Sequence, residues 1–394
     1  MILILGGYFP KKAYQEIIEN SKVQVQFSAN IFQDKLMRGI KNNTSEKLLF
    51  LSAPFINSYP NGYKKNKLEE FESDDNVEYV GFNNLFGVRN ISRYINLKKK
   101  IKKIIPNNEK IDIIVYSPHT PLLFASKFIK KKYENVSVTL LLPDLPCYMD
   151  LSNKKRRLYN FLKKIDNCSF EYLQKYIDKY IFLTEQMNTL INRNNKPYII
   201  VDGMLETKSN LISKAKRNYK IITYTGTLNE KFGIKILIDA FMKVSNQNVK
   251  LVVCGKGDAE TYITTCCELD KRIVYMGLLN SDDSKKLQQE SDILVNPRQN
   301  TEEYTKYSFP SKNMEYLSTY NPVIAYMLDG VSKEYEKIFF VPENDSIEAL
   351  TFKIDEVLNL NDHELKKYRK KIKSFIRRKD YKNVTKEILD FIKN

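Results

Sequence analysis

Residues 221–255 read IITYTGTLNEKFGIKILIDAFMKVSNQNVKLVVCG, and this stretch decides the fold class. It opens and closes with short, largely apolar runs, Ile221–Tyr224 and Lys250–Cys254, and a glycine follows each of them closely. Apolar residues between the runs recur at helical spacing: Ile234, Leu237, Ile238, Phe241 and Val244. A strand, an amphipathic helix and a second strand in this order predict a βαβ unit with parallel strands.

The same alternation of short strands and helical stretches continues along the rest of the chain. In the first half the expected strands are Ile2–Leu5, Lys47–Ser52, Val77–Phe82, Ile111–Tyr116, Ser137–Leu142, Lys179–Leu183 and Tyr198–Val201. In the second half the other expected strands are Arg272–Met276, Asp292–Asn296, Pro322–Tyr326 and Ile338–Val341. Several are apolar throughout, which is typical of strands buried on both faces of a parallel sheet. The sequence therefore predicts an α/β protein with doubly wound sheets.

A chain of 394 residues is long enough for two domains of about 150–200 residues each. The polar and basic stretch Glu206–Asn218 has little to bury, so we expect it to be the linker. The expected domains are then 1–205 and 219–379. A last helix, at about 380–394, carries an apolar face, and we expect it to pack back on the first domain.

The chain carries 64 Lys and Arg against 47 Asp and Glu, a formal net charge of +17. Such an excess attracts nucleic acid, an anionic membrane or phosphorylated substrates, although a merely solvated surface gives the same count. Three stretches concentrate the charge: 91–105, 130–132 and 154–165. In the third, Leu158, Phe161, Leu162 and Ile165 form a stripe that suits either a core or a membrane surface.

Five cysteines without a CxxC spacing, no leader and no long apolar run indicate a cytoplasmic protein. Peripheral contact with the inner face of the cell membrane, through the basic helices, is compatible with this composition.

The few glycines gather where expected strands end. Gly6 and Gly7 follow the first strand, and Gly226, Gly255 and Gly277 follow three strands of the second half. This is the sheet edge at which open α/β folds bind ligands, and glycine there lets backbone N–H groups approach an anion. Ordinary βα turns are the alternative for each one. The spacing around Gly255 does not form GxGxxG, so a bound NAD is not expected.

The segment Tyr307–Leu317 adds a second candidate for anion binding. We expect Ser308 to cap a helix and Pro310 to lie in its first turn, so that free N–H groups and Lys312 face an anion. Glu315, one turn further on, has the chemistry to accept hydrogen bonds from ribose hydroxyls. An exposed helix carboxylate is the alternative.

These motifs together resemble the family 4 glycosyltransferases of the GT-B fold, in which two Rossmann-like domains have their parallel sheets facing a central cleft. The similar stretches are 224–234 with 237–241, 251–258, 274–277, 291–298, 309–317 and 321–325. They run in order through about 110 residues of the C-terminal domain. The first half is similar only at Ile2–Gly7 and at Pro143–Asp144.

The resemblance implies a role for individual residues. Lys231 is similar to the family lysine that binds the donor pyrophosphate, and Gly6 and Gly7 to the loop that faces the same phosphates. Glu315 is similar to the second glutamate of the E-x7-E motif, which is associated with the ribose. The donor site would further include Gly226, Thr227, Gly255, Arg298, Phe309, Pro310, Ser311 and Lys312.

The sequence departs from the family pattern at three places. Tyr307 stands where the first glutamate of E-x7-E is expected, and Glu303 is the nearest substitute. Thr227 replaces a basic residue, which leaves more of the phosphate charge to Lys231. Pro143 replaces a histidine of the N-domain, so Asp144 becomes the acidic candidate there. His119 is a further candidate for catalysis or acceptor contact.

The resemblance implies sugar transfer, with retention, from a nucleoside-diphosphate sugar to a carbohydrate acceptor. We expect a lipid-linked acceptor, such as a polyprenyl-diphosphate sugar, in the synthesis of surface (capsular or exo-) polysaccharide. No metal and no other cofactor are expected, since no His/Cys/Asp cluster has ligand spacing. A sugar-nucleotide epimerase or phosphorylase of the same fold is the alternative, and a basic nucleic-acid-binding protein is the non-enzymatic one. No nucleic-acid-binding signature is present, so nucleic acid is not an expected partner.

Overall fold

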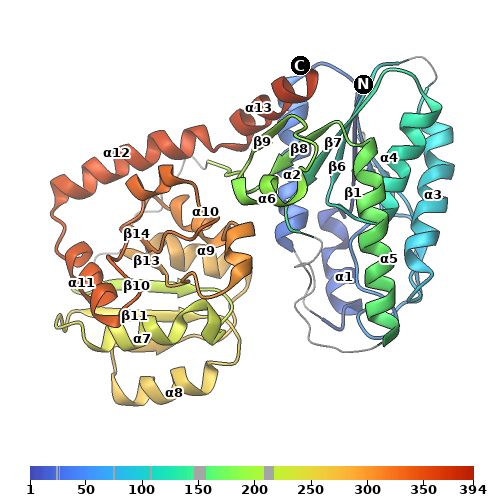
Figure 1. The fold of residues 1–394 in the computed structure, drawn as a ribbon. Coiled ribbons are helices and arrows are strands. Elements are labelled where there is room, and N and C mark those ends of the chain that lie inside the picture. The colour runs from blue at the N-terminus through green and yellow to red at the C-terminus, as the bar shows by residue number, and fades with distance from the viewer. Residues whose placement is uncertain (24, 26, 74–75, 107–108, 146–156, 208–216) are drawn as a thin grey trace. The chain divides into compact units, whose positions relative to one another are not determined.

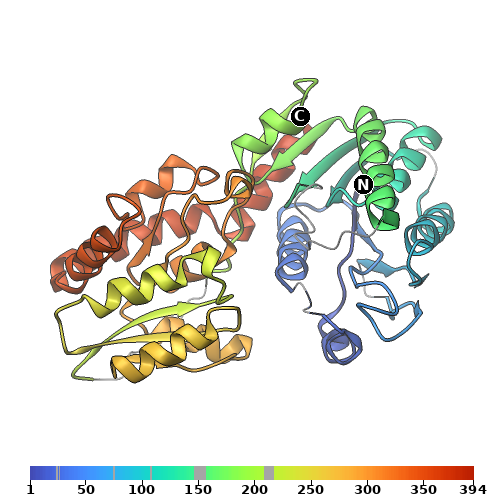
Figure 2. The same cartoon turned by 60° about the horizontal axis from the view of Figure 1, so that its bottom comes forward.

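The computed structural model describes residues 1–394 except 24, 26, 74–75, 107–108, 146–156 and 208–216, and the side chains of 157–163. The chain divides into two compact units: Met1–Asp202 with Tyr381–Asn394, and Gly203–Asp380. Each unit is built on a parallel sheet with helices packed against it (Figures 1 and 2). Most of the linker expected at 206–218 lies outside the described residues.

The first unit holds a seven-stranded parallel sheet in the order β4-β2-β1-β6-β7-β8-β9. Its strands are β1 (Ile2–Gly6), β2 (Leu48–Ser52), β4 (Val77–Tyr79), β6 (Ile111–Tyr116), β7 (Val136–Leu142), β8 (Lys179–Phe182) and β9 (Tyr198–Ile200). A small antiparallel pair joins β3 (Lys67–Leu68) to β5 (Phe82–Asn83). The helices are α1 (Tyr14–Asn20), α2 (Phe27–Asn43), α3 (Arg89–Ile104), α4 (Thr120–Lys132), α5 (Arg157–Leu173), α6 (Glu185–Ile191) and α13 (Tyr381–Lys393).

The second unit holds a five-stranded parallel sheet in the order β12-β11-β10-β13-β14. Its strands are β10 (Lys220–Thr225), β11 (Val249–Cys254), β12 (Ile273–Tyr275), β13 (Ile293–Asn296) and β14 (Val323–Ala325). The helices are α7 (Ile234–Met242), α8 (Glu260–Leu269), α9 (Ser281–Glu290), α10 (Ser311–Leu317), α11 (Ile347–Leu358) and α12 (Asp362–Arg378). All pairings of the two large sheets are parallel, so the predicted fold class is confirmed.

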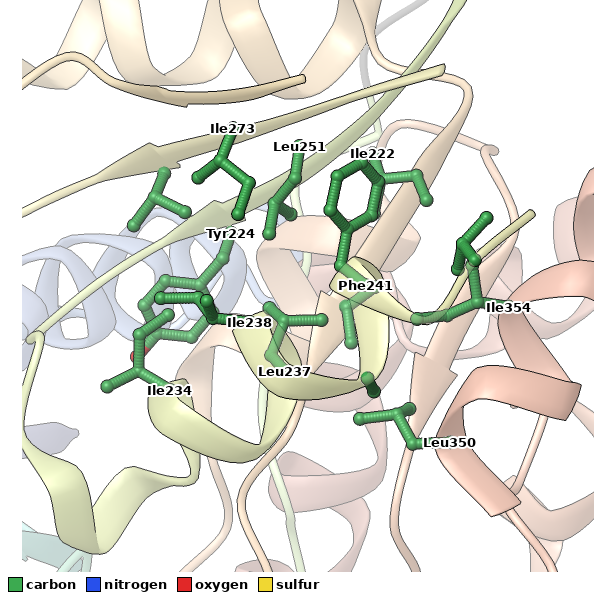
Figure 3. Packing of buried hydrophobic residues seen from close by; sticks show 14 of the residues in the cluster. Ile222, Tyr224, Ile234, Leu237, Ile238, Phe241, Leu251, Ile273, Leu350 and Ile354 are labelled. Carbon is green, nitrogen blue, oxygen red and sulfur yellow. The ribbon is translucent and has the colours of Figure 1, made fainter. Parts of the chain in front are cut away.

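The core of the second unit forms around α7, as its apolar spacing predicts. Figure 3 shows Ile234, Leu237, Ile238 and Phe241 of this helix among side chains from β10, β11, β12 and α11. These four side chains of α7 are fully buried. Burial of one such side chain contributes about 1.5–3 kcal/mol, so the apolar face of α7 holds the helix on the sheet.

Three local expectations were wrong. Residues 338–341 form no strand, because only Phe340 pairs, in an isolated bridge with Ile324. The run 77–82 divides into β4 and β5, which belong to different sheets. The helix α10 has Pro310 as its N-cap instead of Ser308, and Ser308 has an extended backbone after the 3-10 helix Glu303–Tyr307.

Candidate functional site

The topology of the second sheet places a ligand crevice beside β10. Its neighbours β11 and β13 are reached by crossovers that run in opposite directions from this strand, so β10 and β13 flank the switch point of the sheet. Open α/β sheets bind ligands at this point, at the carboxyl ends of the strands. Gly226 directly follows β10, and Pro297 and Arg298 directly follow β13.

The predicted phosphate-binding lysine and Arg298 meet there. Lys231 lies in the 3-10 helix Glu230–Phe232 and is exposed. Its Nζ is 5.4 Å from the centre of the Phe232 ring, and the guanidinium carbon of Arg298 is 5.2 Å from the same centre. Gly233 allows this approach, because its φ is +81° and an added Cβ would lie 2.1 Å from the Pro297 carbonyl oxygen. The two cations therefore share one aromatic ring at the switch point.

The Arg298 side chain has hydrogen-bond donors that are not used within the described part of the chain. Its Nε and Nη2 are buried and have no partner among the described residues. Its guanidinium carbon also lies 4.7 Å from the centre of the Tyr304 ring. Burial lowers the pKa of Arg298, yet an arginine starts high enough to stay charged at neutral pH. Unpaired buried donors are costly, and a phosphate oxygen would satisfy them.

Glu315, a residue of α10, lies near the carboxyl end of β10. Its Oε2 accepts a hydrogen bond from the Lys312 ammonium at 2.6 Å and a longer one, 3.4 Å, from Gln288. Gln288 also donates to the Thr225 hydroxyl at 2.8 Å, and the Thr225 N–H donates to the Tyr316 hydroxyl at 2.9 Å. These bonds tie α9 and α10 to the carboxyl end of β10. Lys312 is thus paired with Glu315 in this structure, which reduces the charge it offers a phosphate.

The remaining candidates around α10 have mainly packing roles. Phe309 and Pro310 are buried, and the Phe309 ring centre lies 5.2 Å from that of Tyr335. Ser311 and Glu303 are exposed. Since α10 has only seven residues, its dipole is short, and the cationic side chains beside the carboxyl end of β13 are those of Lys231 and Arg298.

Gly255 has a steric reason to be glycine. Its φ is +143°, and an added Cβ would lie 1.7 Å from the Gly226 carbonyl oxygen. The Gly226 N–H donates to the Cys254 carbonyl at 3.0 Å, so the two loops lie in direct contact. Thr227 next to them is exposed, and its carbonyl accepts from the Tyr224 hydroxyl. Glycine at these positions therefore lets the loops after β10 and β11 pack together beside Lys231.

In the first unit, Gly6 is the last residue of β1, Gly7 follows it, and both lie close to Gln33 of α2. The Gly7 N–H donates to the buried Gln33 side chain at 2.8 Å. A Cβ on Gly6 would lie 2.4 Å from the same side-chain oxygen, and one on Gly7 would lie 2.0 Å from the Phe55 ring. Packing alone thus explains both glycines, and the N–H of Gly7 already has a partner. Their contact with donor phosphates stays a prediction.

His119 and Asp144 lie at the ends of the adjacent strands β6 and β7. The centre of the His119 ring is 4.3 Å from that of Phe55. Desolvation, followed by the charges of Arg93 and Arg89, lowers the pKa of His119 to about 3, so this imidazole is neutral at pH 7. Desolvation raises the pKa of Asp144 to about 6. A carboxyl group with this pKa can exchange a proton near neutral pH, as acid–base catalysis requires.

Sequence reasoning missed Arg89 and Arg93. Arg93 belongs to the basic stretch 91–105, and Arg89 lies just before it. The composition suggests that the stretch is solvated, yet Arg93 is only 3% exposed. The sequence does indicate that Arg93 is buried, because Arg93, Leu97 and Ile101 recur at spacings of four and form the buried face of α3.

The other basic segments are partly neutralised. Lys100 forms ion pairs with Glu70 and Glu78, and Lys130 forms one with Asp178. Lys154, Lys155 and Arg156 lie outside the described residues, as do the side chains of Leu158, Phe161 and Leu162. Ile165, the last residue of that stripe, is exposed. In the described ranges, no helix combines the length and the apolar character that crossing a bilayer requires.

Comparison with known proteins bears on the family of the second unit and on the fold of the chain. The family model of glycosyl transferases group 1 matches residues 219–360. An uncharacterized glycosyltransferase of Methanocaldococcus jannaschii is 26% identical in an alignment of 217 residues that covers 48% of this chain and 54% of that protein. The matched region thus spans about half of that relative.

Two solved structures show the same fold at low identity. Sucrose-phosphate synthase from Thermosynechococcus elongatus is 13% identical, with a TM-score of 0.64 over 100% of this chain and 98% of that one. A mutant of S. aureus TarM, in complex with Fondaparinux, alpha-GlcNAc-glycerol and UDP, is 15% identical, with a TM-score of 0.54 over 86% and 66%. The chain therefore has the GT-B fold, and its residues 219–360 match the family model of glycosyl transferases group 1.

Proposed function

We propose that this chain is a glycosyltransferase that uses a nucleoside-diphosphate sugar as its donor. The observation that carries the proposal is the pair of cations at the switch point, Lys231 and Arg298, with two unpaired buried N–H groups on Arg298. They lie within the group 1 domain, and the structurally similar TarM was solved with UDP. A diphosphate has the charge and the oxygens that these groups lack.

In the proposed reaction the bond between the anomeric carbon and the diphosphate oxygen breaks, and a bond to the acceptor hydroxyl oxygen forms. The acceptor proton passes to the departing diphosphate, so atoms and charges balance. Lys231 and Arg298 stabilise the negative charge that grows on the leaving group, which is usually the largest catalytic contribution. Glu315 binds the ribose once Lys312 yields its place. We propose retention of the anomeric configuration, as the family resemblance implies.

The test is transfer from a panel of UDP-, GDP- and dTDP-sugars, with UDP and GDP binding measured by calorimetry. We expect Lys231→Ala and Arg298→Gln each to lower the rate by about 10²–10³-fold, as loss of one charged donor to a transition state does. Glu315→Gln should weaken nucleotide binding. Lys250→Ala is the matched control, because Lys250 lies at the amino end of β11, on the opposite edge of the sheet. Full activity in both cation variants would refute the assignment, and turnover without acceptor would favour an epimerase.

We further propose that the acceptor is lipid-linked, as in surface polysaccharide synthesis, and that the first unit touches an anionic membrane. Apolar side chains are exposed just before α3 and along its first turns, among them Phe86, Val88 and Ile91. Exposed lysines follow on the same helix, at Lys99, Lys102 and Lys103. An apolar insertion bordered by basic residues is the pattern of a helix that lies on a membrane surface.

Co-sedimentation with vesicles tests the membrane contact. We expect binding to vesicles that contain an anionic lipid and little binding to neutral ones. Ile91→Glu should weaken vesicle binding about tenfold, whereas Leu269→Glu, a change at a similarly exposed apolar residue of the second unit, should leave it unchanged. Equal binding by Ile91→Glu and the unaltered protein would rule this surface out.

A further inference from the structure

We propose that Arg89 and Arg93 form a phosphate-binding subsite in the first unit, which holds a phosphate group of the acceptor. The assignment to an acceptor rests on the glycosyltransferase function proposed above. The subsite itself rests on the packing and charge of α3, and it lies in the other unit from the donor site.

The two arginines are held rigidly by the loop that follows β2. A terminal nitrogen of Arg93 donates to the Pro54 carbonyl, and its guanidinium carbon lies 4.1 Å from the centre of the Phe82 ring. Arg89 donates to the Ile56 carbonyl at 3.0 Å. These backbone bonds orient the guanidinium groups and leave their charge uncompensated. The buried Nε of Arg93 has no hydrogen-bond partner among the described residues.

No carboxylate forms an ion pair with either arginine in the part of the chain that the structure describes. Desolvation and the nearby charge of Arg89 lower the pKa of Arg93 well below its usual value. The charge of Asp166 acts on Arg89 and raises its pKa, but the Asp166 side chain accepts its hydrogen bond from the Thr120 hydroxyl. The buried charge of Arg93, which has no ion-pair partner among the described residues and lies near the partly buried charge of Arg89, destabilises the fold, and a bound anion would reduce that cost.

The surroundings of the arginines favour an anion in the same way. His119, which senses both of their charges, lies at the end of β6, and β6 and β1 flank the switch point of the first sheet. His119 is also the N-cap residue of the 13-residue helix α4, and its side chain makes no capping bond. The positive end of the α4 dipole therefore adds to the field of the arginines.

Charge count identifies the ligand class. Two guanidinium charges with a helix N-terminus are balanced by a dianion, and a phosphate monoester or a diphosphate carries about two negative charges at pH 7. A single carboxylate carries one. Arg89 and His119 are both partly exposed, so a phosphate can reach them from solvent while Arg93 supports the site from beneath. The source is either a soluble sugar phosphate or a lipid phosphate, and the exposed Val88 and Ile91 beside Arg89 suit the latter.

The chain has only two histidines, which makes the test direct. In full-length protein labelled with 15N-histidine, we would titrate inorganic phosphate at pH 7.5 and constant ionic strength. We expect a saturable shift of the His119 resonances, while those of His363, on α12 of the second unit, stay in place. Arg89→Gln and Arg93→Gln should each weaken the apparent affinity at least tenfold. Lys99→Gln, on the exposed face of the same helix, should not change it.

Two further titrations identify the ligand. Glucuronate, which carries one carboxylate, should shift His119 at least tenfold less effectively than phosphate, and an equal or stronger effect would overturn the phosphate assignment. Short-chain phosphatidic acid that binds more tightly than inorganic phosphate would indicate a lipid source, and equal affinity a soluble one. No saturable shift in the unaltered protein, or unchanged affinity in Arg89→Gln, which keeps the more buried Arg93, would overturn the subsite. UDP binding measured separately reports on the second unit, so either proposal can fail without the other.

Discussion

Individual buried cations define the chemistry of both units. Arg298 in the second unit and Arg93 in the first share an unusual state: each has a buried Nε without a hydrogen-bond partner among the described residues. An unsatisfied buried donor on a charged group costs about 1–3 kcal/mol or more, so a fold that keeps two of them loses stability at both places. A bound anion would accept hydrogen bonds from these donors and restore the lost stability.

Asp144 provides a prediction about single-residue ionisation. Desolvation raises its pKa to about 6, above the ordinary value of 3.8, so folding favours the protonated form. The stability that this preference contributes is fully present below pH 4 and is lost as the pH rises through 6. We therefore expect Asp144→Asn to melt at about the same temperature as the unaltered protein at pH 4. At pH 8 it should melt about 2 °C higher, a small gain because the Asp144 side chain is exposed and solvent screens its charge.

Melting temperatures of Asp144→Asn and the unaltered protein, measured from pH 4 to pH 8, test this prediction. Glu134→Gln removes an exposed carboxylate of the same unit and serves as the control, with a difference that should not grow with pH. A constant difference between Asp144→Asn and the unaltered protein at every pH would contradict the raised pKa. A gain in stability combined with lost transfer activity would be the combination expected of a carboxylate kept for catalysis.

At the scale of elements, periodicity sufficed for most of the fold. The strands β6 and β13 were predicted to within a residue, because each is a mostly apolar run beside clear turn residues. The run 338–341 looks the same in sequence, yet it only bridges to β14 through Phe340. Local composition does not distinguish a short apolar run that forms a strand of a sheet from one that only packs against the sheet. The availability of a neighbouring strand determines which of the two occurs.

The candidate site was predictable to a similar extent. Lys231, Arg298 and Glu315 follow strands or begin a helix, so motif order locates them. The pairing of Lys312 with Glu315 and the sharing of the Phe232 ring depend on side-chain geometry, which spacing does not specify. Arg93 was missed because a lysine-rich helix has too high a mean polarity to suggest a buried charge, and only its register on α3 marks it.

At the scale of the whole molecule, the chain returns to its first unit at its very end. Helix α13 packs along α2, which Figure 1 shows side by side, and its buried residues include Val384, Ile388 and Leu389. An added Cβ on Gly39 would lie 2.3 Å from the Thr385 hydroxyl, so the two helices approach closely. Segments more than 300 residues apart in sequence therefore share one core, and the first unit is complete only when the last helix has docked.

This connection predicts which half of the molecule a C-terminal substitution affects. Ile388→Ala removes a fully buried side chain and should destabilise the first unit by about 2–4 kcal/mol, whereas Ile354→Ala in α11 should destabilise the second by a similar amount. Hydrogen exchange at rising urea concentrations distinguishes destabilisation of the first unit from destabilisation of the second. In Ile388→Ala, protection should fall first in 27–43 and 2–6, which are α2 and β1, with β10 and β13 unchanged. If protection fell first in the second unit instead, α13 would stabilise that unit, and the assignment of 381–394 to the core of the first unit would be incorrect.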